Sequence, residues 1–423
     1  MPPKKRNADN QQPLAQEQPK DDNSKKCKTE PKIMVELNIE EHMYITQLQE
    51  EERTSFFEKL IKINSADSSK IPIRFKIIQS NIPQEIKRDI FKKITVDASS
   101  KYESWVQTIL SIPFTTSTQQ QMKTTPKKLQ AAVTNAKTKM DKALVGHEQA
   151  KDEILRILYQ WIVNPSSHKT PVGLEGPAGI GKTTFAQNAL AVLKKPIVFI
   201  SLSGALDASY LVGHSYTYEG AMCGRIIDAL KEAKCMDPII YLDELDKISN
   251  TPRGVEIVNT LIHIIDPTQN HKFRDKYIGF DIDLSKVVFI FSYNNPSKVC
   301  PILLDRIQRI QCEPPTIQQK IQIAREHLMP RCAKKMNVKT YHNISDNILE
   351  YIINKYTDNE LGVRMLERNL NKILGCINIW KLSPNVLSVQ NQSVEDEITE
   401  KSIDIILQNN NHKHNQSLFS MYT

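Results

Sequence analysis

The chain has 423 residues, of which 40% are hydrophobic and 25% are charged, and its formal net charge at pH 7 is +8. This composition is typical of a soluble globular protein with polar tails, and it argues against a fibrous or wholly disordered chain. No apolar run is long enough for a membrane span, and no apolar core follows the basic N-terminus as in a secretory signal.

The cysteine pattern indicates a reducing compartment of the cytoplasmic type. None of the seven cysteines forms a CxxC pair or lies at zinc-like spacing from histidine. Reduced thiols are therefore expected. The basic cluster at residues 2–6 leaves a nuclear address open, although a plain solvating tail explains it equally well.

The first part of the chain divides into a tail and a helical region. Residues 1–32 are rich in Pro, Gln, Asn, Asp and Lys, which predicts a disordered basic tail. Residues 33–125 are expected to be a helical N-terminal region that ends in a Thr/Gln/Ser-rich linker at 115–125. Apolar residues recur at helical spacing in three stripes, at 56–63, 82–94 and 105–112.

Residues 126–312 have the pattern of an α/β domain. Helical stripes run to Trp161, after which five short apolar runs alternate with helices, at 172–175, 197–202, 239–243, 287–292 and 307–312. Such runs predict a parallel sheet with helices on both faces. Residues 313–408 contain only helical segments, at 317–328, 344–356, 362–380 and 399–407, and predict an all-α lid. The remaining residues, 409–423, form a polar tail.

The strongest motif lies between the first predicted strand and the next helix. Residues 176–183 read GPAGIGKT, which is the P-loop pattern in the context that it requires. Glycines let backbone N–H groups surround phosphate oxygens, and the helix N-terminus favours negative charge. Lys182 can reach the β and γ phosphates of ATP, and the Thr183 hydroxyl can ligate Mg²⁺. The predicted nucleotide-binding set is Gly176, Pro177, Ala178, Gly179, Ile180, Gly181, Lys182, Thr183 and Thr184.

Two carboxylates follow the third predicted strand. After a P-loop, Asp243 at the strand end is expected to hold Mg²⁺ together with Thr183. Glu244 is expected to polarise the water that attacks the γ-phosphate.

Two further polar residues leave alternatives open. Asn294 follows the strand at 287–292, where its amide fits contact with the lytic water or the γ-phosphate, but Asn-Asn-Pro-Ser is also strong turn chemistry. Arg306 fits an arginine finger that reaches a neighbour's nucleotide, and it equally fits a surface ion pair with Asp305.

Over about residues 80–408 the chain resembles the ATPase module of Lon proteases, within the AAA+ superfamily. The resemblance rests on motifs that occur in the family's order, at 213–214, 217–225, 242–247, 266–270, 283–287, 304–306 and 362–368. It implies a P-loop AAA+ sheet in the order 5-1-4-3-2, a helical lid, and a ring of subunits that is expected to be a hexamer.

The resemblance also assigns residues. It places Leu144, Val145 and Gly146 beside the adenine and makes Asn294 the sensor 1 residue. It makes Arg306 the finger that acts on the neighbouring subunit, and Arg364 the sensor 2 residue that reaches from the lid to the γ-phosphate. Tyr218 becomes the aromatic pore-loop residue that grips a threaded polypeptide.

Three departures from the family pattern matter. Glu219 stands where an aliphatic residue is usual, which should weaken the grip on apolar chains, and His263 stands where the family has an acidic residue. The residues after the predicted lid are too few and too polar to build a serine–lysine protease domain, so no intrinsic peptidase activity is expected. Residues 1–80 do not match the family's large N-terminal domain.

The favoured function is an ATP-hydrolysing, ring-forming protein remodeller, or unfoldase, that would need a separate protease to degrade its protein substrates. One alternative is a nucleic-acid-associated AAA+ ATPase, which the basic tail and the positive net charge favour. Another is a regulatory or assembly ATPase that does not thread polypeptides, which Glu219 favours. No membrane partner is expected.

Overall fold

The computed structural model describes residues 49, 52–53, 73–94, 100–118, 126–164, 168–337, 344–382 and 398–408. Nearly all of them belong to the second of two compact units, residues 72–423. The tails predicted at 1–32 and 409–423 and the apolar stripe at 56–63 lie outside the described residues. Among the helices that are described, none is both long and apolar enough to cross a membrane.

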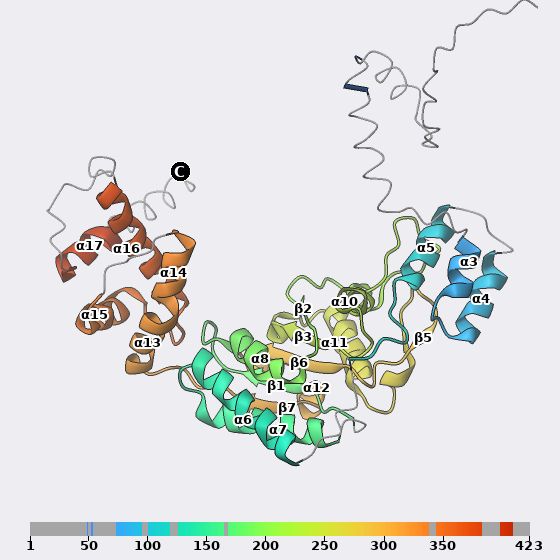
Figure 1. The fold of residues 1–423 in the computed structure, drawn as a ribbon, viewed down its shortest axis with the longest axis horizontal. Helices are drawn as coiled ribbons and strands as arrows, with labels where there is room; N and C mark the ends of the chain where they lie inside the picture. Colours follow the sequence, from blue (N-terminus) through green and yellow to red (C-terminus); the bar gives the residue numbers. More distant parts are fainter. Residues whose placement is uncertain are drawn as a thin grey trace, which may run out of the picture. The chain divides into compact units, whose positions relative to one another are not determined.

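A five-stranded parallel sheet is the centre of the fold (Figure 1). Its strands are β1 (Val172–Glu175), β2 (Ile197–Ser201), β3 (Ile239–Asp243), β6 (Val288–Tyr293) and β7 (Gln308–Gln311). Their order is β2-β3-β6-β1-β7, and every neighbouring pair is parallel. This confirms the predicted parallel sheet and, counted from the opposite edge, the order implied by the family resemblance.

Helices cover both faces of the sheet because alternate side chains of each buried strand point to opposite sides. On β3, Ile239 and Tyr241 join one apolar cluster, and Ile240 and Leu242 join the other. The first cluster includes side chains of α6 (Pro126–Ala143), α7 (Glu148–Val163) and α8 (Lys182–Leu190). The second includes side chains of α10 (Arg225–Ala233), α11 (Pro252–Ile265) and α12 (Pro301–Asp305).

The helices before the sheet are α3 (Ile73–Gln79), α4 (Gln84–Ile94) and α5 (Ser100–Leu110). Two of the predicted apolar stripes correspond to α4 and α5, and their buried members include Ile90, Trp105 and Ile109. These side chains belong to the same apolar cluster as one face of the sheet. The described part of the predicted linker is also anchored, since the N–H of Met236 donates to Thr116 O at 2.8 Å.

Short elements connect the main ones, and the sequence analysis did not anticipate them. An antiparallel pair, β4 (Phe273–Arg274) and β5 (Asp281–Ile282), precedes β6, and its strands are too short for side-chain alternation to be visible. The other short elements are η1 (Ala191–Leu193), α9 (Ser209–Val212), η2 (Leu245–Lys247), η3 (Asn270–Lys272) and η4 (Pro296–Lys298).

The described residues of the C-terminal part contain only helices, as predicted, and they have their own apolar cluster. Its elements are α13 (Ile317–Ile323), η5 (Ala324–Leu328), α14 (Met329–Lys335), α15 (Asp346–Tyr356), α16 (Arg364–Leu382) and α17 (Glu400–Gln408). The sequence analysis ended the first of these helices at Leu328, but the helical path continues to Lys335. The five-residue π turn η5 precedes Pro330, a residue that usually interrupts the α-helical hydrogen-bond ladder.

Candidate active site

The P-loop has the backbone that its sequence predicts. Strand β1 ends at Glu175 and helix α8 begins at Lys182, with Gly181 before it at φ 93°. Gly176 has φ 152°, and a Cβ added there would lie 2.4 Å from the Cys312 carbonyl oxygen. Glycine is therefore required at Gly176 by both conformation and space.

A cavity of about 390 Å³ opens beside the P-loop and brings most of the predicted site residues together. The predicted residues in its wall are Leu144, Val145, Ala178, Gly179, Ile180, Gly181, Lys182, Thr183, Thr184, Asp243, Glu244, Asn294 and Arg364. They come from the α6–α7 connection, the P-loop, the ends of β3 and β6, and the start of α16. The predicted residues outside this wall are Gly146, Gly176, Pro177, Tyr218, Glu219 and Arg306.

The Lys182 ammonium lies at the centre of the polar side of the cavity. It donates to the Gly176 and Pro177 carbonyl oxygens at 2.6 and 2.9 Å and to Asn294 Oδ1 at 2.7 Å. Burial lowers the pKa of Lys182, and the nearby Asp243 carboxylate acts in the opposite direction. The loop carbonyls thus hold the cation at the phosphate-binding turn.

The neighbouring residues Asn294 and Asn295 make different contacts. Asn295 Oδ1 accepts from the Ser297 N–H at 2.9 Å and so forms the turn that begins η4. Asn294 instead lines the cavity and contacts Lys182. The turn chemistry is therefore supplied by Asn295, and the Asn294 side chain faces the cavity.

Asp243 and Glu244 lie at the carboxyl end of β3. Asp243 Oδ1 accepts from the Glu244 N–H at 3.0 Å and from the Ser292 hydroxyl on β6. Glu244 has φ 60°, an uncommon conformation for a residue with a side chain, and it costs of the order of 1–3 kcal/mol. Glu244 therefore combines a strained backbone with a position in the cavity wall.

The donor set fits a magnesium ion that is bound jointly with nucleotide phosphates. Thr183 and Asp243 both line the cavity. No group of three or more His, Cys, Asp or Glu side chains that could hold a metal occurs in the parts of the chain that the structure describes. Mg²⁺ typically takes one or two protein ligands and completes its shell with phosphate oxygens and water, so this pair is sufficient.

Backbone contacts join the lid to the P-loop. The Val363 N–H donates to Gly179 O at 3.1 Å, and a Cβ added to Gly362 would lie 2.4 Å from Ala178 O. Glu360 Oε2 accepts from the Met365 N–H at 2.6 Å, which caps the start of α16. These contacts bring Arg364, the first residue of α16, to the cavity.

The part of the wall that was not predicted comes mainly from the lid. Its residues are Ala143, His147, Ile323, His327, Leu328, Arg331, Val363 and Glu367. Ile323, His327 and Arg331 are four residues apart along one helical path, a spacing that puts them on a common face and was visible in the sequence. His147 Nε2 lies 3.2 Å from Ile180 O, and burial lowers the pKa of His147, which favours the neutral imidazole.

Arg306 lies away from the cavity of its own chain. Its Nη1 donates to Asp266 Oδ2 at 2.8 Å, so its ion-pair partner is Asp266 and not the Asp305 considered from the sequence. The Arg306 side chain remains 41% exposed. His263, near the end of α11, contacts Gln269 Oε1 through Nδ1 at 2.5 Å. A direct role for Arg306 at its own chain's nucleotide has no support in this geometry.

Tyr218 and Glu219 occupy an exposed loop between α9 and α10, in which the Tyr218 side chain is 69% exposed. The Tyr218 N–H donates to Ser215 O at 3.1 Å within the loop. This exposure leaves Tyr218 accessible to solvent.

Comparison with known proteins agrees with these features. Residues 172–314 match the ATPase family associated with various cellular activities (AAA). A Lon protease homolog of Acanthamoeba polyphaga mimivirus is 36% identical over 334 residues, which are 76% of this chain and 33% of that protein. The Lon protease of Campylobacter concisus is 43% identical over 218 residues, which are 51% of this chain and 26% of that protein. The Lon protease of Bacillus thuringiensis is 35% identical over 312 residues, which are 71% of this chain and 38% of that protein.

The chain thus spans roughly a third of the length of these relatives. The family match covers all five strands of the parallel sheet. Residues 172–314 are an AAA ATPase domain, and the chain that carries them is a homologue of the Lon proteases.

Proposed function

We propose that the chain is an ATP-driven protein remodeller that works as a ring. The observation that carries the proposal is the convergence of five side chains on one cavity, from the start of α8, the ends of β3 and β6, and the lid: Lys182, Asp243, Glu244, Asn294 and Arg364. A nucleotide-binding turn alone would need only the first of these. The additional carboxylate, amide and lid arginine are what hydrolysis of the bound ATP requires.

In the proposed reaction a water oxygen forms a bond to the γ-phosphorus while the bond to the bridging β,γ oxygen breaks. Glu244 accepts the proton of the attacking water, and Asn294 orients that water. Lys182 and Arg364 stabilise the phosphate charge that develops. A bound Mg²⁺, held by Thr183 and Asp243, would supply further charge neutralisation.

A ring explains the position of Arg306. Its side chain is partly exposed and paired with Asp266, outside its own cavity. In a closed ring of identical subunits, each such surface meets a neighbour, so Arg306 would stabilise charge at the neighbour's γ-phosphate. We propose a hexamer, in keeping with the family resemblance.

Protein substrates are supported by the exposed Tyr218 and by homology to proteases named Lon. In a ring, six copies of this loop would face a threaded chain. The proposal that these 423 residues do not themselves cut peptide bonds rests on the sequence alone, and casein incubated with the purified polypeptide and ATP tests it.

Two alternatives have specific support. The net charge of +8 favours nucleic acid as the partner. Glu219 in the exposed loop favours a regulatory ATPase that does not thread polypeptides, because a ring of carboxylates repels acidic segments and offers apolar segments no favourable contact.

ATPase stimulation separates the three functions. The purified chain is assayed with unfolded casein, with single- and double-stranded DNA or RNA, and with neither, at two salt concentrations. Unfolded protein alone should raise turnover if the chain remodels proteins. Stimulation by nucleic acid that falls steeply with salt would replace the proposal with the first alternative. Equal turnover in all arms would favour the second.

A further inference from the structure

The segment from Gly213 to Gly224, which carries Tyr218, is here called the grip loop. Its tip is exposed: Tyr218 and Met222 are 69% and 71% exposed. A loop with such a tip holds its aromatic residue at a defined place only if its two ends are fixed, because loop residues otherwise sample many conformations. The ends of the grip loop are held by different parts of the molecule.

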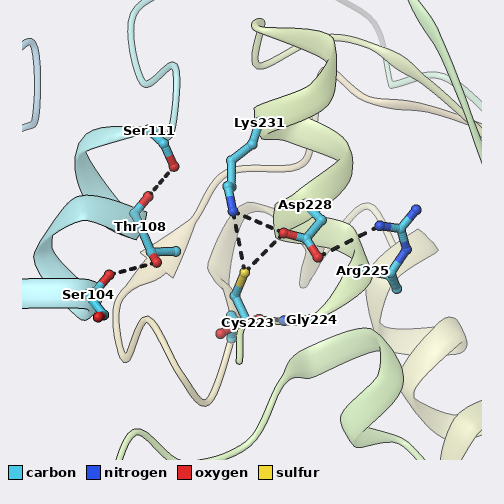
Figure 2. A network of polar contacts seen from close by, with 9 residues as sticks. Ser104, Thr108, Ser111, Cys223, Gly224, Arg225, Asp228 and Lys231 are labelled. Atoms are coloured by element: carbon cyan, nitrogen blue, oxygen red, sulfur yellow. Dashed lines mark hydrogen bonds and ion pairs between the residues drawn. The ribbon is translucent and has the colours of Figure 1, made fainter. Parts of the chain in front are cut away.

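The C-terminal end is fixed by side chains of its own helix (Figure 2). Cys223 Sγ donates to Asp228 Oδ1 at 3.2 Å, and Lys231 Nζ donates to the same oxygen at 3.1 Å. Arg225 Nη1 lies 3.7 Å from the other carboxylate oxygen of Asp228. Burial raises the pKa of the Cys223 thiol to about 12, so the thiol keeps the proton that it donates.

The base of the grip loop is locked to the loop between β4 and β5. The Asp275 carboxylate is fully buried and accepts from the Gly224 N–H at 2.7 Å and from the Tyr277 N–H at 2.8 Å. The Lys276 N–H donates to Val212 O at 2.7 Å. A Cβ added to Gly224 would lie 2.0 Å from Leu211 O. The backbone just before the grip loop is therefore in close contact with the backbone at its end.

The N-terminal half of the grip loop depends instead on helices α4 and α5. Lys93 Nζ of α4 lies 4.7 Å from the Trp105 ring centroid, 4.8 Å from that of Tyr216 and 5.7 Å from that of Phe280. The Trp105 ring centroid is 6.1 Å from that of Tyr216 and 5.7 Å from that of Phe280.

Trp105 also ties α5 to the β4–β5 loop. Its Nε1 donates to Tyr277 O at 2.8 Å. Tyr216 stands two residues before Tyr218, whereas Phe280 belongs to the loop that clamps Gly224. Lys93 and Trp105 therefore contact both the grip loop, at Tyr216, and the β4–β5 loop that holds its base, at Phe280.

We infer that Lys93 and Trp105 are positioning residues that hold Tyr216, and through it the substrate-facing Tyr218, in place. A cation over an aromatic face is attracted by the ring, and three rings around one ammonium leave Tyr216 few alternative positions. The consequence for substrate handling rests on the proposed protein-remodelling function. The ordering of the loop does not, because it follows from contacts within one chain.

The test compares Lys93→Met with Lys93→Arg and with Lys92→Met in the full chain. Methionine keeps the length and apolar stem of Lys93 but removes the charge, and arginine restores a cation. Lys92 is the control on the same helix: its side chain is 73% exposed, and its ion pair with Asp89, at 3.7 Å, involves none of the three rings around Lys93. Thermal unfolding checks that all three variants fold.

The first measurement is amide hydrogen exchange of peptides that cover residues 213–224. Loss of the cation–ring attraction should speed exchange in Lys93→Met by roughly two- to thirtyfold, with Lys93→Arg and Lys92→Met close to the parent. Equal exchange in Lys93→Met and Lys92→Met would overturn the inference.

The second measurement is the KM for unfolded casein in stimulated ATP hydrolysis. Lys93→Met should raise this KM several-fold while basal turnover stays within about twofold, since the nucleotide cavity is untouched. If the parent is not stimulated by casein, the proposed function fails, and the exchange experiment still decides the inference. If exchange rises but a stimulated KM is unchanged, the role in positioning Tyr218 for substrate is wrong.

Discussion

At the residue scale, the catalytic proposal depends most on Glu244. Its left-handed backbone is strained, and its neighbour Asp243 is fixed by the Glu244 N–H and the Ser292 hydroxyl. Strain of this kind persists only where surrounding structure imposes it, and it clusters at functional sites. The strand-end position of both carboxylates was predictable from the apolar run before them and the P-loop upstream. His147 was not, because its place in the cavity arises from its contact with Ile180 across the fold.

Glu244→Gln should leave ATP binding within a few-fold of the parent and lower turnover by about 10²–10⁴, since glutamine keeps the shape but cannot accept the proton of water. Binding is measured with a fluorescent ATP analogue and turnover by phosphate release. Glu232→Gln, on the exposed side of α10, is the control and should behave as the parent. Similar turnover in both variants would remove Glu244 from the mechanism.

At the element scale, the contact between the lid and the P-loop couples nucleotide to the lid. The Val363 N–H and the tight approach of Gly362 join two segments that are almost 200 residues apart in sequence. The strands and most lid helices were predictable, because fully apolar runs and helical stripes are local signals. The β4–β5 pair and α14 were not, since the former is too short for a period and Pro330 resembles a helix terminator.

Gly362→Ala should weaken nucleotide binding, because the added Cβ would lie 2.4 Å from a backbone oxygen that has little room to move. Overpacking of this kind costs about 1–3 kcal/mol, which corresponds to roughly 5- to 150-fold in affinity if the lid must move aside. Gly204→Ala is the control, since an added Cβ there meets nothing within 4 Å. Affinity is measured by titration with the same ATP analogue, and equal values in the two variants would show that the lid contact is not used in binding.

At the scale of the whole molecule, the proposed action of Arg306 requires more than one subunit. The cavity contains a P-loop lysine, two carboxylates and a lid arginine, whereas Arg306 is turned to an outer surface. The ring was inferred from family resemblance, because side-chain periodicity carries no information about symmetry. The packing of α3–α5 into the same apolar cluster as the sheet was also beyond the sequence, since a helical stripe does not reveal its partner.

Arg306→Ala should lower ATP turnover by about 10³–10⁵ without preventing assembly. Mixing it with Lys182→Ala should restore part of the turnover, because some sites then combine an intact P-loop with a neighbour's intact Arg306. A mixture of Lys182→Ala with Glu244→Gln is the control. It should stay inactive, since each variant has a defect in its own cavity and no subunit in the mixture has an intact one. Turnover is followed by phosphate release and assembly by light scattering. No recovery in the first mixture would argue that Arg306 does not act between subunits.

The most direct test of the central claim is ATP-dependent unfolding of a stable fluorescent protein that carries an unstructured tail. Fluorescence is followed in the presence of a trap that captures unfolded chains, with the parent and with Glu244→Gln. The account predicts loss of fluorescence with the parent and ATP, and none with Glu244→Gln. Steady fluorescence while the parent hydrolyses ATP would contradict it.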